Sequence, residues 1–229
     1  MNFDVLVRYG PRMLEGLLVT VELVAISIIF GALIAVPVAL ARLGRNPVLR
    51  GASFGFVYFF RGTPLLAQAF LVYYGSGQFR GFFQTIGLWW FFRDAFYCCL
   101  LTFTLNTAAY QAEILRGAIR SVPPGQWEAA ASLGLRPWQA FVKVILPQAL
   151  IVALRPLGNE VVLMIKGSAV AAIITVFDLM GVTRLAFART FDFSVYLWAA
   201  AIYLIMVEGL RRFWNLLEQR LTRHLALGR

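Results

Sequence analysis

Five long apolar runs, separated by short polar segments, dominate the pattern of this chain. Each run is close to the length of about 20 mostly apolar residues that crosses a bilayer as an α-helix. The predicted spans are residues 17–41, 52–75, 95–117, 148–165 and 196–216. A further apolar run at 169–176 is too short to cross alone and predicts a re-entrant or interfacial segment. The sequence therefore predicts one all-α integral membrane domain over residues 1–229, with about five transmembrane helices.

The composition agrees with a membrane protein and excludes disorder. Hydrophobic residues make up 60% of the 229 residues and charged residues 14%, and the mean hydropathy is +0.74. Soluble domains contain about 45–50% apolar residues. The excess of apolar side chains implies that a lipid bilayer surrounds most of the chain.

The chain is basic, with 21 Lys and Arg residues against 11 Asp and Glu residues. In a soluble protein such an excess suggests nucleic acid, but in a membrane protein it marks cytoplasmic segments, so we expect no nucleic-acid partner. The basic residues between spans one and two, between spans three and four, and at the end of the chain are Arg42, Arg45, Arg50, Arg120, Arg136, Lys143, Arg211, Arg212, Arg220, Arg223 and Arg229. Fewer basic residues lie on the other side, which predicts a periplasmic N-terminus and a cytoplasmic C-terminus.

The polar segment 121–147 predicts a short helix between two chain breaks. A Pro-Pro-Gly run at 123–125 ends the preceding helix, and Gly134 suits the left-handed position that follows a helix. At helical spacing, an apolar face can form from Trp127, Ala131 and Leu135. The pattern fits two interpretations: a connector in the headgroup region, or a docking helix that enters a groove on a cytoplasmic protein.

This segment resembles a motif of bacterial ABC importer permeases. It reads Glu128-Ala129-Ala130, then Gly134, then Val144-Ile145-Leu146-Pro147, which matches E-A-A-x3-G-x9-I-x-L-P except for Val144 in place of Ile. The resemblance implies the type I fold of these permeases, in which the segment is a cytoplasmic coupling helix seated on the ATP-binding subunit. It assigns that contact to Glu128, Ala129, Ala130, Leu133 and Gly134.

Three further segments resemble the polar amino-acid subgroup of these permeases, particularly its histidine, basic amino-acid and opine branch. They are Arg61-Gly62-Thr63-Pro64-Leu65-Leu66 with Gln68, Thr104-Leu105-Asn106-Thr107-Ala108-Ala109-Tyr110 with Glu113, and Asn159-Glu160-Val161. The subgroup often has a Lys-Asp-Thr-Ser-Leu-like run where this chain has Lys166-Gly167-Ser168-Ala169-Val170. The resemblance therefore leaves the roles of Lys166 and Ser168 open.

The resemblance also implies a location and a set of partners. The location is the bacterial inner membrane, and the partners are two ATP-binding subunits, a homologous or identical second permease and a periplasmic substrate-binding protein. The chain contains no G-x-x-x-x-G-K-[ST] loop for nucleotide phosphates. We therefore expect no enzymatic activity, cofactor or metal in this chain, with ATP bound by the partner ATPase.

Polar residues near the bilayer midplane need a partner, a cavity or a function, because charges there are costly. Arg61 lies nine residues into its span, about 14 Å along a helix, and Asn106 and Glu160 reach similar depths. A cation, an amide and an anion at one level suit a zwitterionic substrate. Glu160 would bind an ammonium or guanidinium group, which favours a cationic amino acid or a derivative such as an opine.

The substrate carboxylate would face Arg61 or the amides exposed at the break after it. The complete set of predicted substrate-pathway residues is Glu160, Asn159, Asn106, Tyr110, Arg61 and Thr63. Two alternatives remain open: Arg61 and Glu160 form a buried structural pair, or Arg61 extends to the membrane interface.

Two other functions fit parts of the sequence. Gly51-Ala52-Ser53-Phe54-Gly55 matches the G-x-S-x-G motif of serine hydrolases, but the only histidine, His224, lies in the charged C-terminal tail, so we expect no base beside Ser53. The same glycine spacing could instead let two helices pack closely. The other alternative is a channel or secondary carrier that works without ATP, and uptake without ATP hydrolysis would distinguish it.

Overall fold

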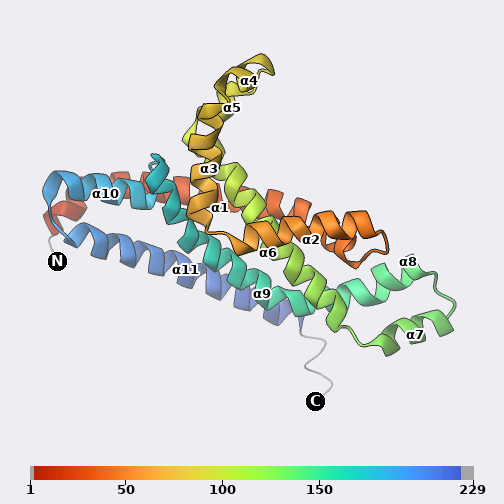
Figure 1. Cartoon of the computed structure of the whole chain (residues 1–229). Coiled ribbons are helices and arrows are strands. Elements are labelled where there is room, and N and C mark those ends of the chain that lie inside the picture. The colour runs from red at the N-terminus through yellow and green to blue at the C-terminus, as the bar shows by residue number, and fades with distance from the viewer. Residues whose placement is uncertain (1–2, 223–229) are drawn as a thin grey trace.

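The computed structural model describes residues 3–222, with side chains from residue 6, and His224 lies outside this part. Its regular elements are all helical, which confirms the predicted fold class. In chain order they are α1 (Phe3–Leu43), α2 (Pro47–Gly62), α3 (Leu65–Gln78), α4 (Arg80–Thr85), α5 (Trp89–Phe92), α6 (Ala95–Ser121), α7 (Pro124–Ser132), α8 (Pro137–Ala140), the π-helix η1 (Phe141–Ile145), α9 (Leu146–Gly167), the 3-10 helix η2 (Ser168–Ile174), α10 (Leu179–Thr190) and α11 (Ser194–Leu221). Figure 1 shows α1, α2, α9 and α11 running roughly along one direction, with α3 rising across it.

Three stretches of the described residues are long and apolar enough to cross a membrane. They are Leu6–Leu43, Pro137–Ile174 and Ser194–Leu221, and the bent pair of α2 and α3 would add a fourth. The first begins well before the predicted residue 17. Its early charged residues do not interrupt the helix, because Arg8 and Arg12 are exposed whereas Tyr9 and Met13, on another face, are buried.

The third predicted span, 95–117, lies within α6 at the centre of the bundle. This helix packs on α1, α2, α3 and α9, and its pairing with α1 is the most extensive in the fold. It is not among the three apolar stretches, because buried polar residues such as Asn106 and Gln111 lower its hydropathy. Polar side chains are tolerated there because neighbouring helices, rather than lipid, surround them.

Small residues let α1 and α6 approach closely. Ala35 and Ala39 of α1 pack against Ala109 and Ala112 of α6 in one buried cluster. Gly31 lies against α6 so tightly that an added Cβ would come within 2.5 Å of the Thr107 Cγ2 atom. Close helix packing in membranes commonly uses such small residues, because dispersion contacts replace the hydrophobic driving force.

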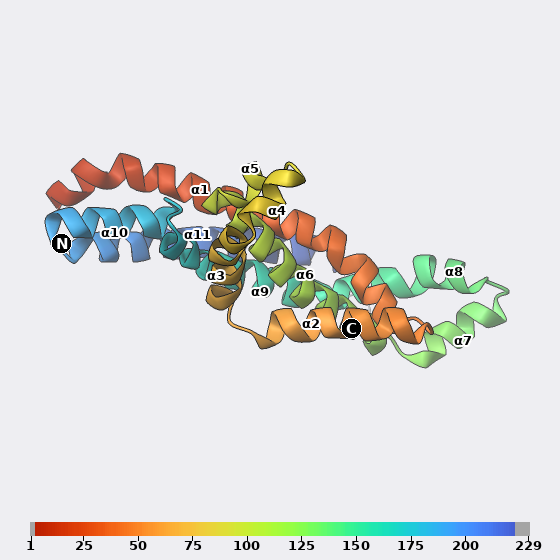
Figure 2. The ribbon, with the colours of Figure 1, turned by 45° about the horizontal axis from the view of Figure 1, so that its top comes forward.

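The predicted span 52–75 is broken into two helices. Pro64 has no N–H and disfavours helical geometry at the residue before it, so α2 ends at Gly62 and α3 begins at Leu65, bent by 103°. Figure 2 gives a second view of this turn from α2 into α3. As a result α3, α4 and α5 form an arm that projects from the other helices (Figure 1).

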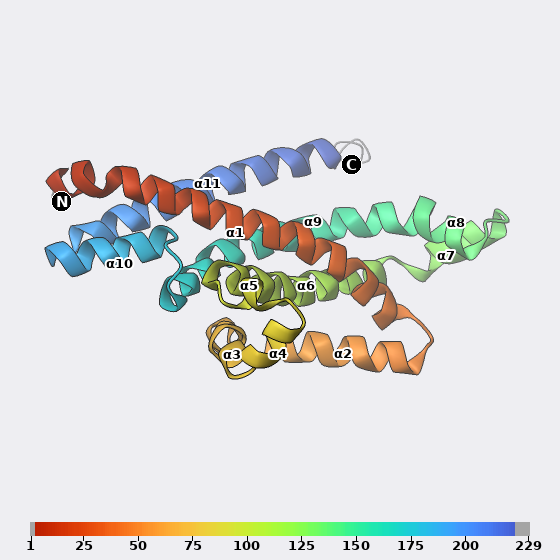
Figure 3. The same ribbon diagram turned by 90° about the horizontal axis from the view of Figure 1, so that it is seen from above.

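The two ends of the bundle differ. Seen from above, α10 lies beside the N-terminal part of α1, whereas α7 and α8 lie at the opposite end (Figure 3). The predicted re-entrant run 169–176 forms η2 and a turn at Thr175, where φ is 69°. We call the end that carries α7 and α8 the α7 end.

Candidate functional site

The break between α2 and α3 is held by Gln68, which sequence reasoning did not include among the site residues. Its Nε2 atom donates hydrogen bonds to the Phe60 carbonyl oxygen at 2.9 Å and to Thr63 Oγ1 at 2.8 Å. The Thr63 hydroxyl in turn donates to the Phe59 carbonyl oxygen at 2.8 Å. The bond to Phe60 satisfies a carbonyl group that would otherwise pair with the residue 64 N–H, which proline lacks. The structure thus gives Thr63 a role in the break itself.

Asn106 ties this break to the central helix. Its Nδ2 atom donates to the Phe60 carbonyl oxygen and to Gln68 Oε1, both at 3.0 Å. Both donor hydrogens of the Asn106 amide are therefore used within the protein. Only its carbonyl oxygen is left for a substrate, which would have to supply a donor.

Glu160 of α9 lies in a row of polar side chains that crosses the bundle. Its Oε1 atom accepts a hydrogen bond from Thr107 Oγ1 at 3.0 Å. Gln111 Nε2 donates to Thr107 Oγ1 at 3.1 Å and to the Ile28 carbonyl oxygen of α1 at 3.3 Å. The row therefore links α9, α6 and α1. Thr107 and Gln111 were not predicted as site residues, although two polar residues four apart in an apolar helix are a usable signal.

The Glu160 carboxylate is buried and forms no ion pair among the described residues. The residue is 4% exposed, and none of the ion pairs in the described part of the chain includes it. Arg61 instead places its guanidinium 5.2 Å from the centroid of the Tyr110 ring, a cation–π distance. The alternative of an Arg61–Glu160 pair is therefore not realised in this structure.

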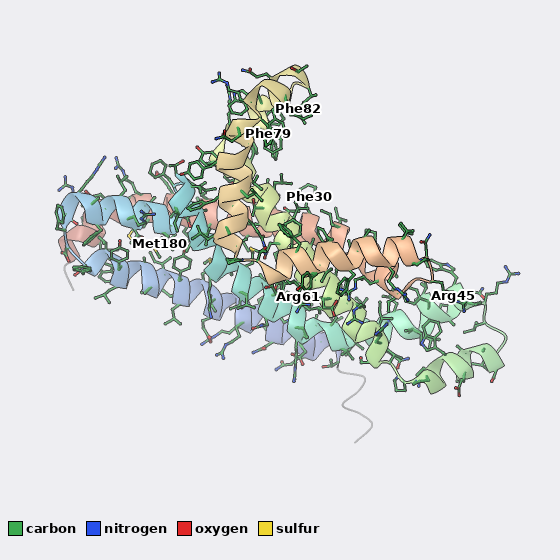
Figure 4. All side chains as sticks on the ribbon, viewed as in Figure 1. Phe30, Arg45, Arg61, Phe79, Phe82 and Met180 are labelled. Carbon is green, nitrogen blue, oxygen red and sulfur yellow. The ribbon has the colours of Figure 1, made fainter. Side chains whose placement is uncertain are left out.

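Two cavities meet at Tyr110. One, of about 220 Å³, is lined by Asn106, Tyr110 and Glu160 together with apolar side chains. The other, of about 350 Å³, is lined by Arg61 and Tyr110 and extends along α6 past Glu113. Figure 4 shows Arg61 at the end of α2 that faces this region. The structure thus brings Asn106, Tyr110 and Glu160 around one space and places Arg61 at the next.

Asn159 does not belong to this arrangement. It lines a different cavity of about 340 Å³ between α9 and α11, with Trp214 and Glu218 among its neighbours. Consecutive residues of a helix point about 100° apart, so adjacency to Glu160 in the sequence does not place Asn159 on the same face. The structure therefore separates Asn159 from Glu160, and a role of Asn159 in the substrate pathway stays a prediction.

Lys166 and Ser168, whose roles the sequence left open, lie in different environments in the structure. Ser168 is fully buried, and its hydroxyl donates to the Ile165 carbonyl oxygen at 2.7 Å where α9 passes into η2. Lys166 is exposed. Neither residue lines the cavities that meet at Tyr110.

The predicted short helix of the coupling segment is α7, and its end has the expected geometry. Gly134 has φ of +74°, the left-handed conformation predicted for it. The Leu135 N–H donates to the Ala130 carbonyl oxygen at 3.1 Å, and the Gly134 N–H donates to that of Ala131 at 2.9 Å. These two bonds are the Schellman motif that closes a helix end.

Within this chain α7 buries one residue, Ala130. Trp127 and Ala131 of the predicted apolar face are exposed, and docking of that face on another protein or on headgroups stays a prediction. Trp127 stacks on Phe141 with ring centroids 6.4 Å apart. Glu128, Ala129 and Leu133 are exposed, and Leu133 reaches 80%.

A π-helix joins this end to the helix that carries Glu160. Pro147 follows α8 within a continuous helical stretch, and a proline clashes with the carbonyl group four residues before it. That residue is Lys143, and η1, over Phe141–Ile145, widens the helix there. The chain from α8 to the end of α9 thus remains helical despite the proline.

The hydrolase interpretation finds no support. The Ser53 hydroxyl donates to the Leu49 carbonyl oxygen at 2.7 Å within α2, and no histidine is among the described residues. The close-packing interpretation is also not met within this chain, because no described atom lies within 4 Å of a Cβ placed on Gly51 or Gly55.

Known proteins with related sequences are permeases. The chain is 39% identical over 226 residues to the nopaline transport system permease protein NocM of Agrobacterium fabrum, covering 98% of this chain and 94% of that protein. It is 34% identical over 213 residues to the arginine ABC transporter permease protein ArtM of Escherichia coli, covering 93% and 96% of the two chains. A crystal structure of an amino acid ABC transporter with histidines matches with a TM-score of 0.85 and 32% identity, over 96% of this chain and 99% of that one.

The family match covers most of the chain. Residues 27–223 match the family described as binding-protein-dependent transport system inner membrane component. This range includes the broken α2–α3 pair, the central α6, the α7 end and Glu160. The chain therefore belongs to that family and is a multi-pass, non-catalytic permease subunit of an ABC importer in the inner membrane.

Proposed function

We propose that this permease moves a cationic, polar amino acid, or a derivative such as an opine, across the inner membrane. The proposal rests on the position of Glu160, a buried carboxylate that lines one cavity with Asn106 and Tyr110 and forms no ion pair among the described residues. The relatives named as nopaline and arginine permeases support the same substrate class.

The electrostatics favour a cation that enters the cavity and leaves it again. A charged side chain in the middle of a membrane helix costs about 2.5–3.5 kcal/mol on insertion scales. An ammonium or guanidinium group on a substrate would offset part of that cost while it is bound. Arg61, beyond Tyr110 in the adjoining cavity, would attract the substrate carboxylate. Asn159, on the other face of α9, takes no part in this proposal.

The energy source is ATP bound and hydrolysed by a separate subunit. In this proposal two ATP-binding subunits, a second homologous or identical permease and a periplasmic substrate-binding protein complete the transporter. The exposed Glu128, Ala129 and Leu133 of α7 contact the ATP-binding subunit, and the buried Ala130 and the turn at Gly134 hold that surface in place. The α7 end and the C-terminus lie in the cytoplasm, and the N-terminus lies in the periplasm.

Movement of α7 would pass through the turn at Gly134 into a continuous helical stretch that contains Glu160. The stretch from α8 through η1 to α9 begins at Pro137 and contains Glu160. At 1.5 Å per residue these two residues are about 35 Å apart along the axis. A shift of α7 during ATP hydrolysis would therefore displace α9 against α6 and change the cavity that the two helices share.

The test is uptake by the complete transporter in proteoliposomes, with Glu160→Gln compared with wild type. We expect arginine uptake to fall at least tenfold, because the variant keeps a hydrogen-bond acceptor but loses the charge that attracts a cation. Assembly with the ATP-binding subunits should be retained. The matched control is Asn159→Ala, the neighbouring position on the other face of α9, which should transport normally.

Two outcomes would contradict the proposal. Equal arginine uptake by Glu160→Gln and Asn159→Ala would remove the carboxylate from the pathway. Uptake that continues when the ATP-binding subunit cannot hydrolyse ATP would overturn the proposed energy source and favour a carrier mechanism. Glutamine tested in parallel shows whether the loss is specific for cationic substrates.

A further inference from the structure

A second charged site lies at the α7 end, outside the cavities that meet at Tyr110. The turn between α1 and α2 and the last turns of α6 enclose a pocket of about 430 Å³. Its charged lining residues are all arginines: Arg42, Arg50, Arg116 and Arg120. We call it the arginine pocket.

The positive charge of this pocket is only partly compensated. Glu113 is the carboxylate that pairs with it, through Arg42 Nη1 at 2.9 Å and through the guanidinium of Arg116, whose Nε atom donates at 3.0 Å. Arg50 and Arg120 form no ion pair in the described part of the chain. One carboxylate against four guanidinium groups leaves an excess of three positive charges around one cavity.

The pocket has a fixed floor and an accessible rim. The side chains of Arg42 and Arg116 are only 13% and 18% exposed, and the Arg42 guanidinium lies 5.3 Å from the centroid of the Phe54 ring. Arg50 and Arg120 are exposed. The floor arginines are thus held by Glu113 and an aromatic ring, whereas those at the rim remain available to a ligand.

The position of the pocket suits a lipid headgroup. The apolar run of α1 ends at Ala41, and Arg42 follows directly, a position that suits the boundary between hydrocarbon and headgroups. Arg120 also lines a neighbouring cavity of about 580 Å³, whose other lining residues are mostly apolar or aromatic, among them Leu40, Ile119 and Trp138. A charged group in the arginine pocket would therefore have apolar space beside it for an acyl chain.

We propose that the arginine pocket binds a phosphate group. Guanidinium groups bind phosphate through paired N–H donors, and basic pockets between membrane helices suit anionic lipid headgroups. The adjoining apolar cavity favours an anionic phospholipid as the source, and soluble phosphate has the same chemistry. This proposal is independent of the substrate that the permease carries, because it uses no residue of the substrate pathway.

The experiment uses the purified permease with its ATP-binding subunits. In one arm, phosphatidylglycerol is titrated into phosphatidylcholine nanodiscs and the bound lipid is counted by native mass spectrometry. In the other arm, inorganic phosphate is titrated calorimetrically in pure phosphatidylcholine. Both arms compare wild type with Arg50→Gln/Arg120→Gln, which leaves the Glu113 ion pairs intact. The matched control is Arg45→Gln, an exposed arginine of the same turn that does not line the pocket.

We expect the double variant to bind phosphatidylglycerol at least tenfold more weakly than wild type, with Arg45→Gln unchanged. The same variant pattern with inorganic phosphate alone would support the site with a soluble ligand. Equal weakening by the double variant and by Arg45→Gln, or no binding of either probe by wild type, would overturn the proposal. If the double variant does not assemble, the single variant Arg50→Gln is measured in its place, because Arg50 is an exposed residue at the rim.

Discussion

At the scale of single residues, the buried polar side chains of this permease serve the backbone as well as the cavity. Asn106 donates both of its amide hydrogens to the α2–α3 break, and Thr63 and Gln68 complete the same network. Replacing Asn106 would therefore disturb the break before it tested any contact with a substrate. Glu160 is different, because its one described hydrogen bond comes from a threonine hydroxyl and it forms no ion pair in the described part of the chain. It is the more selective position to test.

Asp178 provides a pH-dependent prediction outside the candidate spans. Its Oδ1 atom caps α10 by accepting the Gly181 N–H at 2.8 Å, whereas its Oδ2 atom is buried without a hydrogen-bond partner. Burial raises the pKa of this carboxyl group to about 6, although the hydrogen bond from Gly181 opposes the shift. The unfolded chain has a pKa of about 3.9 at this position, so the folded state binds the proton more tightly.

The contribution of Asp178 to stability is therefore complete only below the unfolded pKa of about 3.9 and is lost as the pH rises through about 6. We expect the free energy of unfolding of wild type, relative to Asp178→Asn, to fall by about 2 kcal/mol between pH 4 and pH 7.5. Asparagine keeps the capping oxygen and has no charge to bury. Denaturant unfolding of both proteins across this range measures the difference, and parallel pH profiles would refute the assignment.

The residues of the cavity were partly predictable. Depth along each helix indicated that Asn106 and Glu160 lie at one level, and they share a cavity with Tyr110. Asn159 was misplaced because depth does not determine which face of a helix a residue occupies. Thr107 and Gln111 were missed because they are neutral. A neutral polar side chain costs less free energy in a membrane helix than a charged one, so its presence does not imply a particular partner.

At the scale of elements, chain breaks determine where the helices of this protein can move or bend. Pro64 separates α2 from α3, Gly134 ends α7, and the π-helix accommodates Pro147. The residue types at these positions were visible in the sequence, and they predicted the breaks near Pro64 and at Gly134. The predicted start of a span at residue 148 was wrong, because the helix continues through Pro147. The angle of 103° was not visible in the sequence, because proline interrupts the hydrogen-bonded ladder without fixing how the next helix leaves. That direction is set by the bonds from Gln68 and Asn106.

Gly134 allows a test of the turn that follows α7. Its φ of +74° is strained for residues with a Cβ atom. We expect Gly134→Ala to lower the free energy of unfolding by about 1 kcal/mol and to reduce the substrate uptake per ATP hydrolysed. Gly134→Asn should be milder, since asparagine tolerates the left-handed conformation. Unfolding and coupled uptake assays on the complete transporter measure both effects.

The control for this turn is Gly125→Ala. Gly125 lies in the first turn of α7, has no positive φ, and has open space around its missing Cβ. Alanine should be neutral or slightly stabilising there. If Gly134→Ala behaved like Gly125→Ala, the left-handed turn would have no importance for coupling.

At the scale of the whole molecule, this chain exposes many large apolar side chains. The arm of α3, α4 and α5 packs on α6 near its base, projects from the bundle and carries exposed aromatic residues, among them Phe79 and Phe82 toward its tip (Figure 4). Composition predicted a membrane protein, and charge placement predicted its orientation. Neither could predict the arm. The direction of the arm depends on the bend after α2, and any contact with its exposed surface would come from lipid or from other chains.

The last prediction concerns assembly and rests on the proposed contact between α7 and the ATP-binding subunit. Leu133 is 80% exposed at the end of α7, although leucine gains about 1.5–3 kcal/mol when it is fully buried. If the ATP-binding subunit covers it, Leu133→Ala should weaken association about tenfold, which corresponds to about 1.4 kcal/mol. Leu49→Ala is the matched control, because Leu49 is also exposed and begins α2 at the same end of the bundle. Titration of the ATP-binding subunit onto the permease in nanodiscs measures both dissociation constants. Equal affinities for the two variants would place the contact elsewhere on the α7 end, whereas a selective loss in Leu133→Ala would assign it to the exposed face of α7.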